Sequence, residues 1–296
     1  MRLPAPEPSM RALAALFLVG VAGFTKVADF PHDSTCFTEG FAFAADGSLW
    51  ESCGRPMGVR ESRLRQFELG SAGHVVEKAD GGYFAEGIAI MGRTLFQLTY
   101  ESRKIFKYSA FTGDYVGEKP FPYEGWGLTT DGCVLYATTG SSKLYALDPH
   151  SLEVTSSVEV VDSAGASQTK LNELEYVAPY VWINVFESSK ILRVDPVTGV
   201  AGHSIDVGSL YAWDGRKVPN GIAYSHARSP TSLFVTGKFW PQIFELQLSM
   251  DDLCGPVPPS ATCSAAPQSA CLHASLLART PRAVGHRRPL GARPLQ

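Results

Sequence analysis

The stretch DGCVLYATTGSSKLYALDP, residues 131–149, holds a turn, a short apolar strand, a mostly polar linker and a second short strand. The same unit recurs at residues 46–69, 92–109, 179–196 and 231–248. Its first strand carries an equivalent aliphatic residue in every copy, with spacings of 46, 40, 46 and 52 residues: Leu49, Leu95, Leu135, Val181 and Leu233. A period of about 40–50 residues built from short strands is typical of a β-propeller.

A further strand precedes each of these pairs. Its five copies are TEGFAFA (38–44), AEGIAIM (85–91), GWGLTTD (125–131), NELEYVA (172–178) and NGIAYSH (220–226). A last strand is expected in the variable stretches, for example over residues 154–161. The sequence therefore predicts an all-β fold, a five-bladed β-propeller with four-stranded antiparallel blades around a central channel. A parallel βαβ fold needs amphipathic helices between its strands, and the pattern shows none of useful length. Two β-sandwiches would leave the fivefold recurrence unexplained.

Composition and the two ends of the chain suggest three segments. A net charge of −3 argues against a general nucleic-acid binder, and 45% hydrophobic residues argue against a disordered protein. The apolar run at residues 12–24 predicts a signal peptide or an uncleaved membrane anchor within residues 1–28. The propeller is assigned to residues 29–250. Residues 251–296 hold seven prolines and five arginines, and we expect a disordered tail there, with a partner-binding arm as the alternative.

The cysteines indicate the same compartment as a signal peptide. Six cysteines fit an oxidising environment, so the expected location is the secretory pathway or the extracellular space, or a single-pass anchor if the apolar segment is retained. Their spacing suits no zinc site. Cys36 and Cys53 flank a predicted hairpin, where a disulfide and two free buried thiols are both possible.

The start of each innermost strand carries a polar or aromatic residue. Because a propeller brings these starts together at one end of its channel, we expect them to surround one cavity. The set is Glu39, Glu86, Trp126, Asn172 and Asn220. Two carboxylates, an indole and two carboxamides suit a small polar ligand with a cationic amine. A hydrogen-bonded turn residue is the alternative for Glu86.

Aromatic residues near these positions are candidates for the walls of the cavity, with packing between blades as the alternative. They are Phe37, Phe84, Tyr100, Phe186 and Trp240. Lys238 lies close by, in the segment TGKFWP.

Six of these segments resemble, in order, the signatures of the plant and bacterial, propeller-type glutaminyl-peptide cyclotransferases. They are FTEGFAF (37–43), YFAEGIAI (83–90), EGWGLTTDG (124–132), LNELEYV (171–177), NGIAY (220–224) and LFVTGKFWPQIFEL (233–246). Any one of them is a weak signal, whereas six in order, spread over all five blades, are specific.

The resemblance implies cyclisation of an N-terminal glutamine to pyroglutamate with release of ammonia. Peptides and proteins with N-terminal glutamine would be the substrates of a monomeric enzyme that needs no metal or other cofactor. The glutamate of the second motif, the proposed acid/base of the family, falls on Glu86. The matching substrate-binding positions are Phe37, Glu39, Phe84, Tyr100, Trp126, Asn172, Phe186 and Lys238.

Several of these positions depart from the family pattern. A glutamine of the first motif has become Glu39, and two tryptophans have become Tyr100 and Phe186. The third blade has Thr138-Thr139-Gly140 in place of a common Ser-Asp-Gly, and a glycine is replaced by Ala85. Two carboxyl groups facing one cavity would raise the pKa of one of them.

Two other functions stay open from the residues alone. One is a propeller without catalytic activity that binds a peptide or partner at the channel mouth, which the changes at Glu39, Tyr100 and Phe186 favour. The other is a metal-dependent hydrolase, because Glu39, Glu86, Asn172 and Asn220 nearly supply the oxygen ligands of a hard cation.

Overall fold

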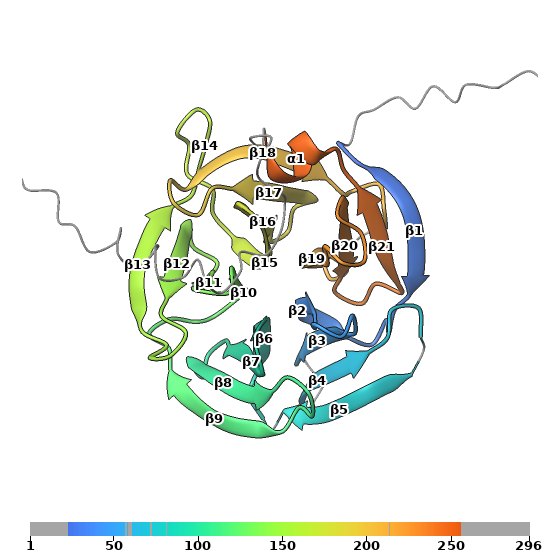
Figure 1. Cartoon of the computed structure of the whole chain (residues 1–296), viewed down its shortest axis with the longest axis vertical. Coiled ribbons are helices and arrows are strands. Elements are labelled where there is room, and N and C mark those ends of the chain that lie inside the picture. The colour runs from blue at the N-terminus through green and yellow to red at the C-terminus, as the bar shows by residue number, and fades with distance from the viewer. Residues whose placement is uncertain are drawn as a thin grey trace, which may run out of the picture.

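Five antiparallel sheets surround a central channel as the blades of a propeller (Figure 1). They are seen in a computed structural model, which describes residues 23–56, 58, 61–71, 73–80, 82–212 and 214–255. The predicted all-β, five-bladed architecture is confirmed.

Each blade runs outward from the channel in chain order. Blade 1 is β2 (Phe37–Phe43), β3 (Leu49–Gly54), β4 (Ser62–Phe67) and β5 (His74–Asp80). Blade 2 is β6 (Ala85–Met91), β7 (Thr94–Thr99), β8 (Lys104–Ser109) and β9 (Tyr115–Pro120). Blade 3 is β10 (Leu128–Thr130), β11 (Leu135–Ala137), β12 (Lys143–Leu147) and β13 (Val154–Glu159). Blade 4 contains β15 (Leu171–Val177), β16 (Tyr180–Val185), β17 (Lys190–Val194) and β18 (Val200–Asp206).

Blade 5 joins the two ends of the propeller. Its inner strands are β19 (Pro219–Tyr224), β20 (Ser232–Gly237) and β21 (Gln242–Gln247), and its outer strand is β1 (Thr25–Pro31) from the start of the chain. β1 pairs antiparallel with β21, with Phe30 opposite Ile243. The propeller thus begins at Thr25, before the boundary predicted at residue 29, because this strand closes the ring.

Two elements differ from the predicted repeat. β14 (Val161–Asp162) pairs in parallel with β18 and gives blade 4 a fifth strand. The start of the segment predicted as a disordered tail forms helix α1 (Met250–Cys254). α1 packs on blade 4, where Leu253 is buried and its carbonyl accepts a hydrogen bond of 3.2 Å from Trp182 Nε1. Most of the predicted tail and residues 1–22 lie outside the described residues.

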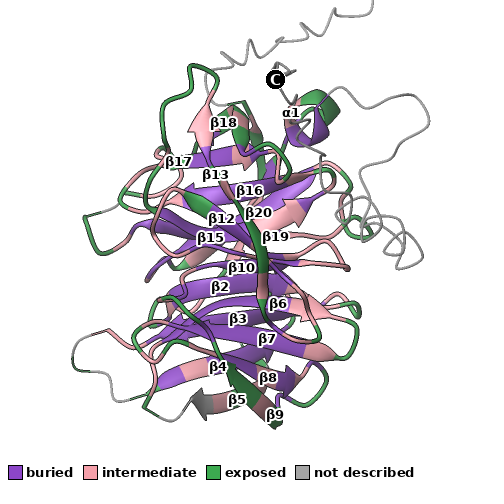
Figure 2. Cartoon of the chain, turned by 90° about the vertical axis from the view of Figure 1, so that its left-hand side faces the viewer, coloured by how far each residue is buried: buried purple, intermediate pink, exposed green. Residues whose placement is uncertain are grey.

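The core lies between blades and explains the aliphatic pattern of the repeats. Leu49, Leu95, Leu135, Val181 and Leu233 are all fully buried. In Figure 2 the inner and middle strands are buried, whereas outer strands such as β9 and β13 are mostly exposed or intermediate. This gradient follows from the wedge shape of a blade, whose outer edge alone faces solvent.

Several of the cysteines form disulfides, as expected for a protein from an oxidising compartment. Cys36 and Cys53 form a disulfide, which settles the alternative that the sequence left open. Cys133 and Cys254 each take part in a disulfide as well. No helix in the described part of the chain has the length and apolar character to cross a bilayer.

Candidate active site

The starts of the five innermost strands meet at one end of the channel, as the repeat predicts. Glu39 lies on β2, Glu86 on β6, Asn172 on β15 and Asn220 on β19, and all four are at most 5% exposed. Trp126 precedes β10 and is partly exposed. These residues come from five separate blades, so the ring closure itself creates the cluster.

Glycines next to the two glutamates let the inner strands approach one another. A Cβ on Gly40 would lie 2.6 Å from the backbone nitrogen of Ile88, and one on Gly87 would lie 2.4 Å from that of Leu128. Real Cβ atoms do not come so close to backbone, so any larger residue would push the blades apart. The Glu-Gly pairs of the sequence thus combine a polar site residue with a position that only glycine fits.

A cavity of about 920 Å³ opens at this end of the channel. All nine residues that the resemblance assigns to the site line it, namely Phe37, Glu39, Phe84, Glu86, Tyr100, Trp126, Asn172, Phe186 and Lys238. Its other lining residues are Arg55, Pro56, Glu101, Arg216 and Phe239. These five lie on connections between strands, where the repeat pattern gives no signal.

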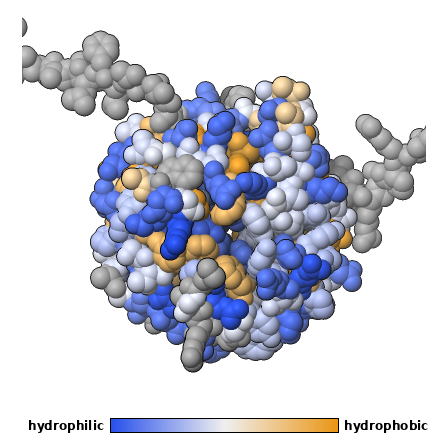
Figure 3. Space-filling model, turned by 180° about the vertical axis from the view of Figure 1, so that it is seen from behind, coloured by the Kyte–Doolittle hydropathy of each residue, from blue (hydrophilic) through white to orange (hydrophobic). Residues whose placement is uncertain are grey.

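The aromatic residues form walls on two sides of the cavity. Phe84 makes edge contacts with Phe37 and Tyr100, at ring-centroid distances of 6.2 and 6.1 Å. Trp126 makes an edge contact with Phe186 at 5.6 Å. Apolar surface gathers near the centre of the face shown in Figure 3, inside a more hydrophilic border.

Trp240 does not belong to these walls, and that prediction is wrong. Its side chain is fully buried in the core of blade 5, where Nε1 donates a hydrogen bond of 2.8 Å to the carbonyl of Lys217. Its neighbour Phe239 lines the cavity instead and contacts Phe37 at 5.2 Å. Phe239 has a φ of 59°, a backbone conformation that a repeat pattern does not reveal.

Glu39 is held on both of its oxygens by blade 5. Lys238 Nζ donates to Oε1 at 2.6 Å, and Asn220 Nδ2 donates to Oε2 at 3.0 Å. The same Lys238 ammonium lies 4.1 Å from the ring centroid of Phe37 and 5.4 Å from that of Phe186. Glu39 and Lys238 therefore form a desolvated ion pair against aromatic rings.

Glu86 is a buried carboxyl group next to a negative one. It lines the same cavity as Glu39, from the neighbouring blade. Burial and the charge of Glu39 hold the pKa of Glu86 well above its usual range, and the positive charge of Lys238 only partly opposes them. Burial also raises the pKa of Glu39, against the opposing effect of Lys238. These effects favour the protonated form of Glu86.

Asn172 lines the cavity and carries an unused acceptor. The side chain is 2% exposed, and its Oδ1 has no hydrogen-bond partner within the part of the chain that the structure describes. A buried carbonyl oxygen without a partner is unfavourable, so this atom is available for an N–H group of a ligand.

Two further glutamates, Glu173, which is buried, and Glu175, which is partly buried, were missed by the sequence reasoning. Glu173 accepts a hydrogen bond of 2.7 Å from the backbone nitrogen of Ile222. Glu175 accepts 3.0 Å hydrogen bonds from the backbone nitrogen of Tyr224 and from Thr129 Oγ1. Burial raises the pKa of Glu175 to about 8 and that of Glu173 well above its usual range. They connect inner strands of different blades, and their signal was the alternation of glutamates in LNELEYV.

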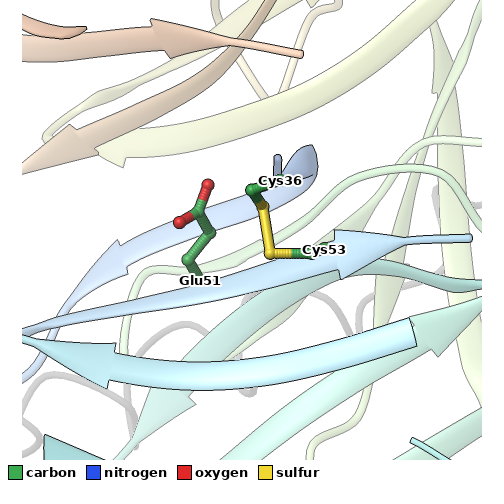
Figure 4. A group of neighbouring side chains, drawn as sticks. All are labelled: Cys36, Glu51 and Cys53. Carbon is green, nitrogen blue, oxygen red and sulfur yellow. A yellow bond between two sulfur atoms is a disulfide. The ribbon is translucent and has the colours of Figure 1, made fainter. Parts of the chain in front are cut away.

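One group of possible metal ligands occurs among the described residues, and it does not suit a cation. It consists of Cys36, Glu51 and Cys53 (Figure 4). The two sulfurs are joined in a disulfide, and the Glu51 carboxylate already pairs with His32 and Arg65. At the cavity, a cation between Glu39 and Glu86 would meet the ammonium of Lys238. The ligand set suggested for a metal-dependent hydrolase is thus already neutralised by the protein.

Comparisons with known proteins agree on one family. The family model described as "Glutamine cyclotransferase" matches residues 11–248. A curated protein of Arabidopsis thaliana, "Glutaminyl-peptide cyclotransferase", is 36% identical over 233 residues, which are 75% of this chain and 70% of that protein. The crystal structure of Myxococcus xanthus glutaminyl cyclase superposes with a TM-score of 0.70 at 30% identity, covering 76% of this chain and 95% of that one.

Proposed function

Because the chain belongs to the glutamine cyclotransferase family, we propose that it converts the N-terminal glutamine of peptides and proteins to pyroglutamate with release of ammonia, with Glu86 as the general acid and base. The observation that carries the role of Glu86 is local. Glu86, whose pKa is raised, and Asn172, whose Oδ1 has no partner among the described residues, line one cavity between aromatic walls.

The cyclisation needs no second reactant. The α-amine nitrogen of the substrate forms a bond with the side-chain carboxamide carbon, and the bond from that carbon to the amide nitrogen breaks. Glu86 gives its proton to the departing nitrogen and regains one from the nitrogen that has entered the ring, so ammonia leaves and the carboxyl group is restored. General acid–base transfer of this kind contributes roughly 10²–10⁴-fold to a rate.

The other cavity residues hold the substrate in a folded conformation. Phe84 and Trp126 offer apolar surface to the glutamine side chain, and Asn172 Oδ1 accepts one of its N–H groups. Holding amine and carboxamide together supplies a proximity effect, because ring closure requires a conformation that is rare in a free peptide.

We also propose that the protein acts in the secretory pathway or outside the cell, as a monomer. The Cys36–Cys53 disulfide supports an oxidising compartment. The predicted signal peptide or anchor lies almost entirely outside the described residues.

The test is an ammonia-release assay on a dipeptide that begins with glutamine. The same dipeptide with an acetylated N-terminus is the matched control, because it keeps the carboxamide but lacks the attacking amine. Release of ammonia from the free dipeptide alone is expected. Binding of the free dipeptide without release of ammonia would contradict catalysis and leave a peptide-binding propeller.

A further inference from the structure

Glu39 has no freedom to change partners. Its two oxygens accept from Lys238 and Asn220, at 2.6 and 3.0 Å, and its side chain is 2% exposed. Asn220 Nδ2 is itself fixed by a second hydrogen bond of 2.8 Å, to the carbonyl of Thr38. A group so placed, with an ammonium and an amide donor on it, is a carboxylate.

Glu86 completes the arrangement from the neighbouring blade. Two carboxyl groups that line one desolvated cavity repel each other when both are ionised, which favours a proton on one of them. Because Glu39 already receives a cationic donor, the proton lies on Glu86. Packing also fixes Glu39 beside Phe84, since a Cβ on Gly54 would come within 2.9 Å of Glu39 Cγ and 2.7 Å of the Phe84 ring.

We propose that Glu39 and Glu86 act as a carboxyl pair that shares one proton, in which Glu39 is the positioning residue that keeps Glu86 protonated for the departing nitrogen. This role rests on the proposed cyclisation. A neutral carboxamide in place of Glu39 could not hold a proton on its neighbour by charge.

The charges of the pair also favour one form of the substrate. Lys238, Glu39 and protonated Glu86 sum to zero, so an α-ammonium would bring an uncompensated charge into a desolvated site. The neutral amine is both the form that binds without this penalty and the form that attacks. A peptide α-amine has a pKa of about 7.7–8.0, so this form is already present near neutral pH.

Other titratable groups face the pair from several elements. Those that line the same cavity are Arg55, Tyr100, Glu101 and Arg216, and the charge of Glu39 also raises the pKa of Glu173 on β15. Lys238 is the one cation among the described residues that is in contact with Glu39, at 2.6 Å. Replacing Glu39 by glutamine thus removes the nearest negative charge and leaves Lys238 to act on Glu86.

The pH dependence of kcat in the parent and in Glu39→Gln tests the pair. Glu86 works as an acid while it is protonated, so activity falls as pH rises through its pKa. Removal of the negative neighbour lowers that pKa, and the alkaline limb of the profile is expected to move down by about one pH unit or more, a tenfold loss of rate on that limb. Alkaline limbs that coincide in the two proteins would overturn the proposal.

A measurement without turnover separates this proposal from the proposed function. The infrared difference spectrum between the parent and Glu86→Gln isolates the carboxyl band of Glu86 from those of Glu173 and Glu175. The pair predicts a protonated Glu86 at neutral pH that titrates at lower pH once Glu39 is replaced by glutamine. An ionised Glu86 at neutral pH in the parent would overturn the pair even if ammonia is released. A protonated one would uphold it even if no peptide is cyclised.

Discussion

Replacing Asn172 by leucine should lower activity without lowering stability. The leucine side chain is similar in size to asparagine, and it removes the Oδ1 that has no hydrogen-bond partner within the described part of the chain. A buried acceptor left without a partner destabilises a protein by about 1–3 kcal/mol, so the free energy of unfolding should stay the same or rise.

Catalytic activity, in contrast to stability, should decrease. In the complex, Oδ1 accepts a substrate N–H whose charge changes during the reaction, and such a hydrogen bond is worth about 1.5–3 kcal/mol. Its loss corresponds to a decrease in kcat/KM of roughly 10- to 150-fold.

Two assays test the expected effects of Asn172→Leu on activity and on stability. Steady-state ammonia release gives kcat/KM, and thermal unfolding gives Tm for the same preparations. Tyr123→Phe is the control, because it removes only a hydroxyl group from a residue that does not line the cavity. An Asn172→Leu protein with kcat/KM within about twofold of the parent, or with a sharply lower Tm, would refute the reasoning.

Three further predictions concern stability and pH. Glu51→Gln leaves Arg65 buried beside a neutral group, so unfolding should become easier by about 3 kcal/mol in a urea titration, and an unchanged midpoint would contradict this. Gly87→Ala should lower Tm or abolish folding, whereas Gly202→Ala, where a Cβ meets nothing within 4 Å, should change Tm by less than about 2 °C. The pKa of Glu175 rises on folding from 4.5 to about 8, so the folded state binds the extra proton and stability falls as pH rises between these values. Urea titrations across that pH range should show a smaller decrease in the free energy of unfolding for Glu175→Gln than for the parent. Equal decreases in the two proteins would exclude Glu175 as the cause.

The fold was predictable because equivalent positions of the five blades have the same surroundings and therefore carry the same pattern of residues. Each copy needs one aliphatic residue between blades, as Leu49 and Leu233 show, and three inner strands need a glycine where the next strand comes close, as at Gly40 and Gly87. The sequence did not predict that β1 closes the ring. This strand lies at the outer edge of blade 5, is largely exposed and contains no glycine, so it does not carry the repeat pattern.

The candidate site was predictable for a related reason, and the errors in its prediction concern single residues. Equivalent positions in a closed ring must converge, so Glu39, Glu86 and Asn172 were found from register alone. Whether Trp240 or Phe239 faces the cavity depends on one residue with a positive φ. The partners of Glu39 lie nearly 200 positions away along the chain, at separations of 199 and 181 residues, and spacing carries no information about such contacts.

Ammonia release by the parent and by Glu86→Gln tests the central claim most directly. Glutamine at this position keeps the size of the side chain but has no acid proton to transfer. We expect stoichiometric ammonia and pyroglutamyl product from the parent, and a rate lower by about 10²-fold or more in Glu86→Gln. Equal rates in two folded proteins would contradict the account.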